Sequence, residues 1–366
     1  MKSLCIQAIA FSLYREISYG DKKKFIEMYG SFSGLMQAIS KQEFLDARHE
    51  PVLQKLSSDL DLQRAQKEYE RIESMGAWMM IWSEPDYPKH LGQISNPPLV
   101  LYGMGRKDFQ QGVELGFVGP RKPSHYGQRV AQWLAKELVA HEMTLVSGMA
   151  LGIDAVAHNI ALESRGYTVA VVAHGLAQCY PAEHRRLYNW IAKEGTVLTE
   201  YTPDTKPLRE FFPARNRIIS GLSQGLLVVE AGRKSGVRIT ANHAIEQFRE
   251  IYAVPGPIDQ ELSMYPNMLI AEGAKMVRSA RDILEDFPQL LEKAESGKKE
   301  PSKTQKLNSN QQKVLQHFYQ DGSKSIEQLR SESQLPTSKL LQTLTELELE
   351  GWVSRRADAR YTLLRK

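Results

Sequence analysis

The stretch from Val118 to His158 decides the fold. It reads VGPRKPSHYG at 118–127 and, after a helix-like run, LVSGMALGIDAVAH at 145–158. A short apolar strand is predicted before each turn, at 115–118 and at 143–146. Each strand runs into a turn of glycine and small polar residues, and each turn opens a helix. This alternation of strand, glycine turn and helix is typical of a doubly wound parallel sheet.

The two turns are expected to lie at one edge of that sheet, which we call the rim. In doubly wound sheets, ligands bind at the carboxyl ends of the strands, where helix N-termini present free backbone N–H groups. The first turn supplies Arg121 and Ser124, and the second supplies Ser147, Gly148 and Gly152. Small residues beside a cation suit a phosphate, so the rim is predicted to bind a phosphorylated ligand.

Length and composition set wide bounds. A chain of 366 residues predicts two or three domains, and a net charge of +4 permits nucleic acid without arguing for it. Cys5 and Cys179 lack metal spacing and indicate a reducing compartment without disulfides. The apolar run 5–13 is followed at once by Arg15 and Glu16, which favours the first helix of a domain over a signal peptide. No run is long enough to span a bilayer, and a cytoplasmic protein is expected.

Residues 1–72 are predicted to form an all-helical domain, because apolar residues recur there at helical spacing. Short helices around Gly30 could grip a DNA backbone, as in helix-hairpin-helix or SAM-like domains. An accessory bundle that packs on its neighbour is the favoured alternative, because the hairpin lacks a clear Gly-x-Gly.

The rest of the chain divides into an α/β domain, a linker and a small module. Residues 73–292 hold apolar, β-branched runs that suit strands buried on both faces of a sheet. The polar stretch at 293–306, KAESGKKEPSKTQK, is typical of a linker. Residues 307–366 predict three helices and a two-stranded ribbon with a basic tip at Arg355, Arg356 and Arg360, which is a winged-helix pattern.

A second informative stretch is FFPARNRIISG, at 211–221. Arg215, Asn216 and Arg217 come at a helix start beside Phe212. Arginines bind phosphate in a forked, bidentate manner, and a neighbouring aromatic ring can stack on a base. The alternative is structural: Arg215 or Arg217 forms an ion pair with Glu230.

A third small-residue turn joins the rim. Ser235 and Gly236 follow a predicted strand, and Thr240 lies in the helix after them. Lys206, upstream, adds to the cations gathered at the rim. This local density is informative where the global charge is not.

Catalytic motifs are absent from the sequence. The histidines are scattered, with no HExxH and no cysteine partners, so no metal site is expected. Ser147 is not in a G-x-S-x-G context. Asp154 could orient a ligand hydroxyl or cap its helix, and the cap is favoured. We therefore predict a phosphate-binding rim with no catalytic residue, metal or cofactor.

The sequence resembles a known family, the bacterial DNA-processing protein A family (DprA/Smf). The match runs in order over about two hundred residues, and its main segments are PPLVLYG at 97–103, VGPRKPSHYG at 118–127, VSGMALGIDAVAH at 146–158, FPARNRIISGLS at 212–223 and VVEAGRKSGVRITA at 228–241. The resemblance implies an extended Rossmann-like, mostly parallel sheet with an all-helical N-terminal domain and a C-terminal winged helix.

The resemblance also implies a function. It implies a non-enzymatic homodimer that binds single-stranded DNA, protects incoming strands and loads the RecA recombinase onto them past the strand-binding protein SSB during natural transformation. Except for Lys206, which charge and position suggest, the resemblance carries the following strand-binding set onto this sequence: Gly119, Arg121, Ser124, Ser147, Gly148, Lys206, Phe212, Arg215, Asn216, Arg217, Ser235, Gly236 and Thr240.

Two segments depart from the family pattern. Pro120 stands where Ser or Thr is common, which removes a hydroxyl and a backbone N–H. The segment Ser263–Asn267 replaces a segment that usually has a small residue before its Asn, so that loop is expected to differ in shape.

Two questions stay open from the sequence alone. A nucleotide hydrolase of the phosphoribohydrolase type is the alternative function, with Arg217 and Glu230 in its key roles, although the usual Pro-Gly-Gly-x-Gly-Thr turn is absent. The winged helix could bind DNA or protein. Its third helix carries Glu346, Glu348 and Glu350, which disfavour a phosphate backbone, so protein contact is favoured.

Overall fold

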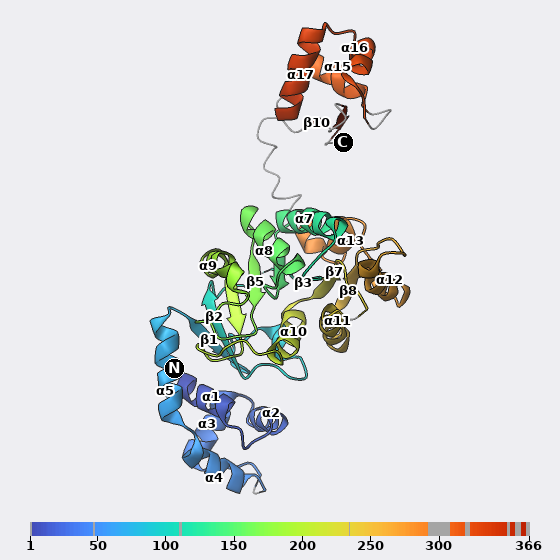
Figure 1. Ribbon diagram of the computed structural model, residues 1–366. Coiled ribbons are helices and arrows are strands. Elements are labelled where there is room, and N and C mark those ends of the chain that lie inside the picture. The colour runs from blue at the N-terminus through green and yellow to red at the C-terminus, as the bar shows by residue number, and fades with distance from the viewer. Residues whose placement is uncertain are drawn as a thin grey trace. The chain divides into compact units, whose positions relative to one another are not determined.

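The computed structural model describes residues 2–46, 48–109, 112–233, 235–291, 308–318, 323–349, 352–355 and 360–363. The chain divides into two compact units, Met1–Glu295 and Ser296–Lys366 (Figure 1). None of the helices in the described ranges is long and apolar enough to cross a membrane.

The first unit begins with five helices, which agrees with the all-helical N-terminal segment that the apolar spacing predicts. They are α1 (Lys2–Leu13), α2 (Tyr19–Met28), α3 (Phe32–Lys41), α4 (Glu50–Asp59) and α5 (Leu62–Ser74). The side chains of Ser18, Ser31 and Asp61 cap three of them by accepting a backbone N–H from the first turn. Phe11 and Phe32 are buried between the helices, with ring centroids 5.6 Å apart.

A nine-stranded sheet follows in the same unit. Its strands are β1 (Trp78–Ile81), β2 (Val100–Gly105), β3 (Glu114–Val118), β4 (Thr144–Ser147), β5 (Thr168–Val171), β6 (Thr196–Thr199), β7 (Gly225–Val228), β8 (Glu250–Ala253) and β9 (Lys275–Met276). The spatial order is β1-β2-β6-β5-β4-β3-β7-β8-β9. The strands from β6 to β9 in this order pair in parallel, whereas β1 and β2 pair antiparallel at one edge. The predicted doubly wound, mostly parallel sheet is confirmed.

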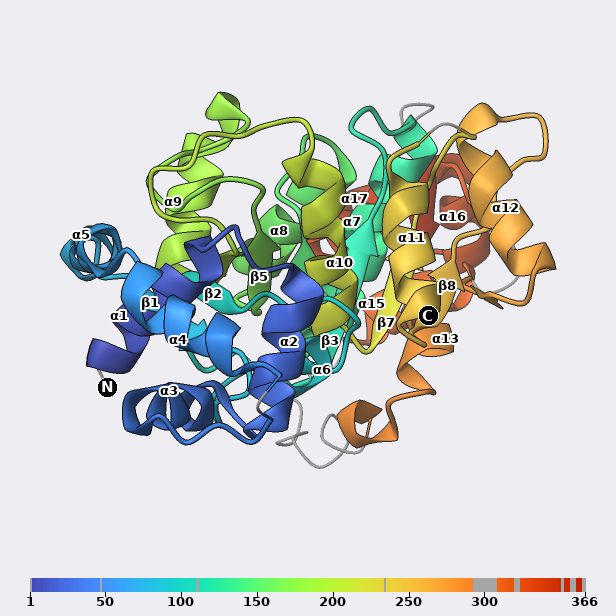
Figure 2. The ribbon, with the colours of Figure 1, turned by 90° about the horizontal axis from the view of Figure 1, so that it is seen from below.

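Helices cover both faces of the sheet. They are α6 (Lys89–Gly92), α7 (His125–Ala140), α8 (Ile153–Glu163), α9 (Arg185–Glu194), α10 (Phe211–Leu222), α11 (Val237–Glu246), α12 (Met264–Ala271) and α13 (Ala280–Leu284), with short 3-10 turns η1 (Ala182–His184) and η2 (Glu261–Ser263). Phe117 packs in one apolar cluster with Leu134 of α7. Val118, the next residue, packs in another with Ile218 of α10, because successive strand residues face opposite sides. Figure 2 shows α10 and α11 side by side on that second face.

The connectivity places a crevice at β3. The chain runs outward from β3 through β4, β5 and β6, and then returns to add β7 on the other side of β3. Such a reversal of strand order opens a crevice at the carboxyl ends of the two strands that flank it. The rim predicted from the sequence lies at this switch point.

The second unit has the predicted winged-helix architecture. Its elements are α15 (Ser309–Gln316), α16 (Ile326–Ser333), α17 (Thr337–Leu349), β10 (Val353–Arg355) and β11 (Tyr361–Leu363). The two strands pair antiparallel, and Lys324 adds a bridge to Tyr361. Leu329, Leu340 and Leu344 form part of its fully buried core. Arg356, Glu350 and the predicted linker at 293–306 lie outside the described residues, as does the side chain of Arg355.

Candidate nucleic-acid interface

A cavity of ≈ 250 Å³ opens at the switch point, and we call it the rim cavity. The turn after β3, the turn after β4, the first three turns of α10 and the start of α11 all contribute to it. Its lining consists of Val118, Gly119, Pro120, Arg121, Ala150, Asp154, Phe212, Pro213, Arg215, Asn216, Ile219, Ser235, Gly236, Val237, Ile239 and Thr240.

The turn after β3 supplies close packing and exposed cationic side chains, Arg121 and Lys122. A Cβ atom on Gly119 would lie 2.4 Å from Ile153 Cγ1, so glycine lets the start of α8 approach β3. Ser124 caps α7 as predicted, by accepting from Gly127 N at 3.0 Å. Its hydroxyl also donates to Glu230 Oε1 at 2.5 Å, so it is engaged inside the protein. Arg121 is exposed at the mouth of the cavity.

The turn after β4 is held by hydrogen bonds within the protein. Ser147 is fully buried, and its hydroxyl donates to Phe117 O at 2.6 Å. Asp154 Oδ2 accepts from Gly148 N at 3.1 Å and from Ala150 N at 3.3 Å. The carboxylate of Asp154 therefore fixes the turn that precedes its helix. The favoured cap interpretation is wrong, because the N-cap residue of α8 is Gly152 and no side chain caps this helix.

Arg215 is turned inward beneath this turn. Its side chain is 4% exposed, and Nη1 donates to the carbonyl oxygens of Gly148 (2.8 Å) and Val171. Burial lowers the pKa of the Arg215 guanidinium to about 10, although the charge of Asp154 opposes this shift. A Cβ atom on Gly148 would lie 2.6 Å from Arg215 Nη2, so the glycine makes room for the guanidinium. Arg215 therefore forms part of the cavity wall, and its guanidinium, which already donates to backbone carbonyls, is not free to bind a phosphate in a bidentate manner.

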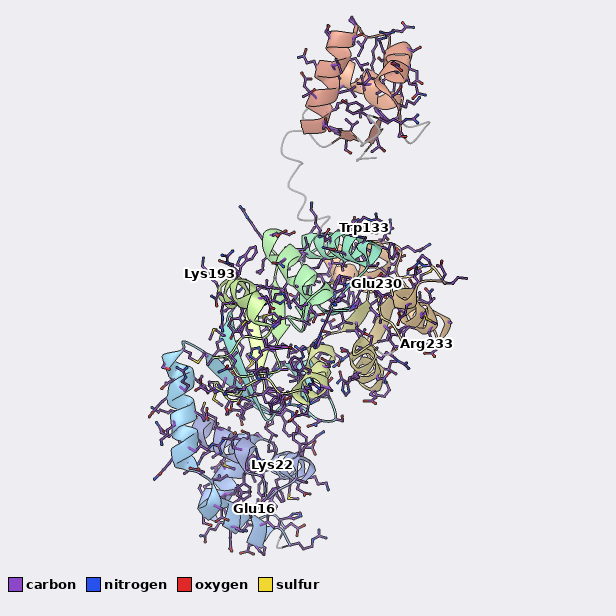
Figure 3. All side chains as sticks on the ribbon, in the orientation of Figure 1. Glu16, Lys22, Trp133, Lys193, Glu230 and Arg233 are labelled. Atoms are coloured by element: carbon purple, nitrogen blue, oxygen red, sulfur yellow. The ribbon has the colours of Figure 1, made fainter. Side chains whose placement is uncertain are left out.

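Arg217 faces away from the rim cavity. Its guanidinium forms a bidentate ion pair with Glu200, with both N–O distances at 2.6 Å, and Nε donates to Asn96 O at 2.8 Å. Burial would lower the pKa of Arg217, but the hydrogen bonds and charge of Glu200 outweigh it and raise that pKa. The alternative pairing of Arg215 or Arg217 with Glu230 is wrong, because Glu230 (labelled in Figure 3) accepts from Ser124 instead.

Two aromatic rings and a guanidinium gather at the mouth of the rim cavity. The rings of Phe212 and Tyr180 meet edge to face, with centroids 5.4 Å apart. The Arg121 guanidinium lies 5.8 Å from the centre of the Phe212 ring. Tyr180 is 43% exposed. The sequence prediction missed Tyr180, although the Tyr-Pro pair that ends the loop after β5 was a signal for it.

The turn before α11 lines the rim cavity, whereas Lys206 in the loop before α10 does not. Ser235 Oγ accepts from Val237 N at 3.2 Å at the start of α11, and Thr240 is buried in the cavity wall. Gly236 is exposed and has open space around it. Lys206 is exposed in the loop before α10 but does not line the rim cavity.

The structure thus brings together most, but not all, of the predicted set. The members that line the rim cavity are Gly119, Arg121, Phe212, Arg215, Asn216, Ser235, Gly236 and Thr240. Gly148 lies beside its mouth with Arg121 and Phe212. The hydroxyls of Ser124 and Ser147 are used internally, and Arg217 and Lys206 lie elsewhere.

The two departures from the family pattern are accommodated locally. The carbonyl of Pro120 accepts from Ile153 N at 3.3 Å, so this residue still joins β3 to α8. Asn267 exchanges two hydrogen bonds with the backbone of Gly256, at 3.1 and 2.9 Å. The segment that was expected to be a loop is helical, because Met264–Asn267 begins α12, and its asparagine tethers the turn that follows β8.

The fold and the rim cavity define a Rossmann-type protein with a cavity at its switch point and a separate winged-helix unit. Residues 78–288 match the family described as DNA recombination-mediator protein A, and residues 298–359 match the DprA winged helix domain. The chain belongs to the DNA recombination-mediator protein A family, as the sequence resemblance predicts.

Relatives and solved structures agree with this membership. The chain is 34% identical to protein Smf of Escherichia coli (strain K12) over 334 residues, covering 86% of this chain and 87% of that protein. It is 42% identical to DNA processing protein DprA of Bacillus subtilis (strain 168) over 208 residues, covering 57% of this chain and 70% of that protein.

Two solved structures share the fold. The X-ray structure of DprA from Streptococcus pneumoniae matches with a TM-score of 0.60 at 31% identity, over 78% of this chain and 92% of that one. DNA processing protein A from Helicobacter pylori, whose structure is described as giving insight into a single-stranded DNA binding mode, matches with a TM-score of 0.53 at 26% identity, over 58% and 96%.

Proposed function

We propose that this protein binds single-stranded DNA in the rim cavity, protects it and loads the RecA recombinase onto it during natural transformation and recombination, without enzymatic activity. The observation that carries the proposal is the group formed by the exposed Arg121 and Tyr180 with the half-buried Phe212 at the mouth of the rim cavity. The single-stranded DNA binding described for the Helicobacter pylori relative supports the choice of ligand.

The chemistry of the mouth suits a single strand more than a duplex. Arg121 would neutralise a phosphate, and counterions released from the strand would favour binding. Phe212 and Tyr180 would stack on unpaired bases, whose faces are covered in a duplex. Arg215 and Asp154 would act only by holding the turn after β4 in place. Each of these roles fits the observed exposure of the side chain.

The partners belong to the same proposal. A homodimer would place two rim cavities on one strand and raise its avidity. RecA would then be loaded onto the bound strand, and SSB would be displaced from that strand. The hydrolase alternative loses support because Arg217 is bound to Glu200 and Glu230 is bound to Ser124, so the two residues do not form one site. Release of free base from AMP would revive it.

Fluorescence anisotropy with a labelled single strand tests the proposal. Replacing Phe212 with Ala should cost about 1–3 kcal/mol of binding free energy, the usual value of one stacked base. Replacing Arg121 with Ala should weaken binding and reduce the slope of log K against log salt by about 0.7, because one phosphate contact is lost. Lys136→Ala, on the exposed side of α7, is the charge control.

Either of two results would contradict this proposal. The first is a wild-type protein that binds no single strand or that prefers the duplex competitor. The second is a pair of folded variants, Arg121→Ala and Phe212→Ala, that bind as tightly as wild type at both salt concentrations.

Removing the winged-helix unit, residues 307–366, should leave the affinity for a single strand within about tenfold, because Glu346 and Glu348 on α17 repel a phosphate backbone. The same anisotropy titration measures this. A larger loss would assign the winged helix to DNA binding in place of protein contact.

A further inference from the structure

We propose that a second strand-binding subsite lies in the cleft between the N-terminal helices and the β2–β6 side of the sheet, and that a single strand leaving the rim cavity continues into it across the first turn of α10. We call this cleft the junction cleft. It is lined by, among others, Arg15, Tyr19, Arg64, Glu200, Tyr201 and Phe211 and has a volume of ≈ 780 Å³. This inference rests on the proposed function of the rim cavity.

The two walls of the junction cleft are fixed to each other. The hydroxyl of Tyr19 donates to Pro97 O, which ties α2 to the loop before β2. The Phe32 amide donates to Ser83 Oγ at 2.8 Å, at the start of α3. On the other side, Arg71 of α5 pairs with Asp204 at 3.2 Å in the loop before α10. The cleft is therefore preformed, and binding in it needs little ordering of the protein.

The cleft offers an aromatic surface. The rings of Tyr201 and Phe211 are stacked, with centroids 4.2 Å apart and planes 25° apart. Both rings line the cleft and are half-buried. A base can stack on such a pair whatever its identity, because every base has an aromatic face.

The charges in the cleft favour an anionic ligand. Arg15 and Arg64 are exposed, and neither guanidinium forms an ion pair with any residue that the structure describes. The carboxylate of Glu200 is already neutralised by Arg217. Glu210 also lines the cleft, so one exposed carboxylate stands against two exposed arginines. A phosphate backbone is the ligand that this balance and the stacked rings recognise together.

Continuity with the rim cavity comes from α10. Phe211 and Phe212 are consecutive, so their side chains leave the helix about 100° apart. Phe212 lines the rim cavity and Phe211 lines the junction cleft. A strand that stacks on Phe212 therefore needs to cross only the first turn of α10 to reach the second aromatic surface.

Oligonucleotides of two lengths test this inference. A strand of about 5 nucleotides is short enough to be held by one site, whereas one of about 20 nucleotides can reach both. We expect Arg15→Gln/Arg64→Gln to bind the long strand roughly tenfold more weakly at low salt and to lower its salt slope by about 1.4, two phosphates at ~0.7 each. Binding of the short strand should not change.

A matched control removes two charges elsewhere. Lys136→Gln/Lys193→Gln alters exposed lysines on α7 and α9 (Lys193 is labelled in Figure 3), and neither lysine lines the junction cleft. This control should bind both strands like wild type. Tyr201→Leu, which keeps an apolar side chain, should also weaken only the long strand, and a thermal melt checks that each variant is folded.

The outcomes separate this inference from the proposed function. If wild type binds no single strand, the proposed function fails. If wild type binds and the Arg15/Arg64 variant binds both lengths with an unchanged salt slope, the rim cavity stands and the junction cleft is not a strand site; a partner protein would then be its better occupant. If the lysine control weakens binding of the long strand as much as the arginine variant does, the loss of affinity comes from net charge alone. That result would contradict the proposed subsite.

Discussion

Replacing Arg215 with alanine is expected to lower the free energy of unfolding by about 3–5 kcal/mol, the usual cost of breaking a buried charged network. The side chain is 4% exposed and donates to the carbonyl oxygens of Gly148 and Val171. Without it, those carbonyls and the buried carboxylate of Asp154 lose their compensating positive charge. Denaturant unfolding followed by tryptophan fluorescence reports on the first unit, which holds Trp78, Trp82, Trp133 and Trp190.

Two variants give this prediction its controls. Arg121→Ala removes an exposed guanidinium at the same cavity and should change stability by no more than about 0.5 kcal/mol. Arg215→Lys keeps the charge but loses the planar fork, so it should be intermediate. An Arg215→Ala protein that is as stable as wild type, yet fails to bind a single strand, would make Arg215 a ligand of the strand and contradict the structural role.

The arginines of α10 show what sequence reasoning could and could not separate. Arg215 and Arg217 were predicted to serve one site, although residues two apart on a helix do not share a face. Phe212, Asn216 and Ile219 line the rim cavity at helical spacing, whereas Phe211, Ala214 and Arg217 line the junction cleft. Helical periodicity alone would have divided the two sets. That Arg215 turns inward depends on tertiary packing, which no local pattern contains.

The hydroxyls of Ser124 and Ser147 make a related point. The small polar turns predicted them as ligands, and the turns are indeed where the sequence placed them. Both hydroxyls, however, bond to groups brought close only by the fold: Glu230, two residues after β7, and Phe117 O on β3. A buried hydroxyl almost always has a hydrogen-bond partner within the protein. When that partner is distant in the sequence, the structural role of the hydroxyl cannot be predicted from the local sequence.

The fold itself was largely predictable, because parallel strands that are buried on both faces have nearly continuous apolar, β-branched sequences. Every run assigned as a strand between Trp78 and Ala253 forms one. The two-residue β9 carries no such signal and was missed. The antiparallel pairing of β2 with β6 was not predictable either, because partner choice is set by how elements pack and not by hydrophobic period.

Replacing Glu114 with glutamine is expected to stabilise the protein at pH 8 by about 3 kcal/mol. Glu114 begins β3 and is 5% exposed. Burial raises the pKa of its carboxyl group to about 7, although the hydrogen bond from Gln224 Nε2 (3.3 Å) opposes the shift. Above that pH the folded protein holds a buried carboxylate. Since one pKa unit corresponds to about 1.36 kcal/mol, raising the pKa of this carboxyl group from 4.5 to about 7 destabilises the ionised folded protein by about 3 kcal/mol.

The direction of the pH dependence follows from which state holds the proton. Between about pH 4.5 and 7 the folded state keeps the Glu114 proton while the unfolded state loses it, so the stability of wild type falls as the pH rises. Glutamine cannot ionise, so the difference in unfolding free energy between Glu114→Gln and wild type should be near zero at pH 4 and grow to its full value by pH 8. Denaturant unfolding at several pH values measures that difference, because the contributions of the other titrating groups are the same in both proteins and cancel.

The control is Glu163→Gln, at the exposed end of α8, whose difference in unfolding free energy from wild type should not grow with pH. A difference that stays constant from pH 4 to pH 8 would mean that the Glu114 carboxyl keeps the same pKa in the folded and unfolded states, and burial would then not control its ionisation.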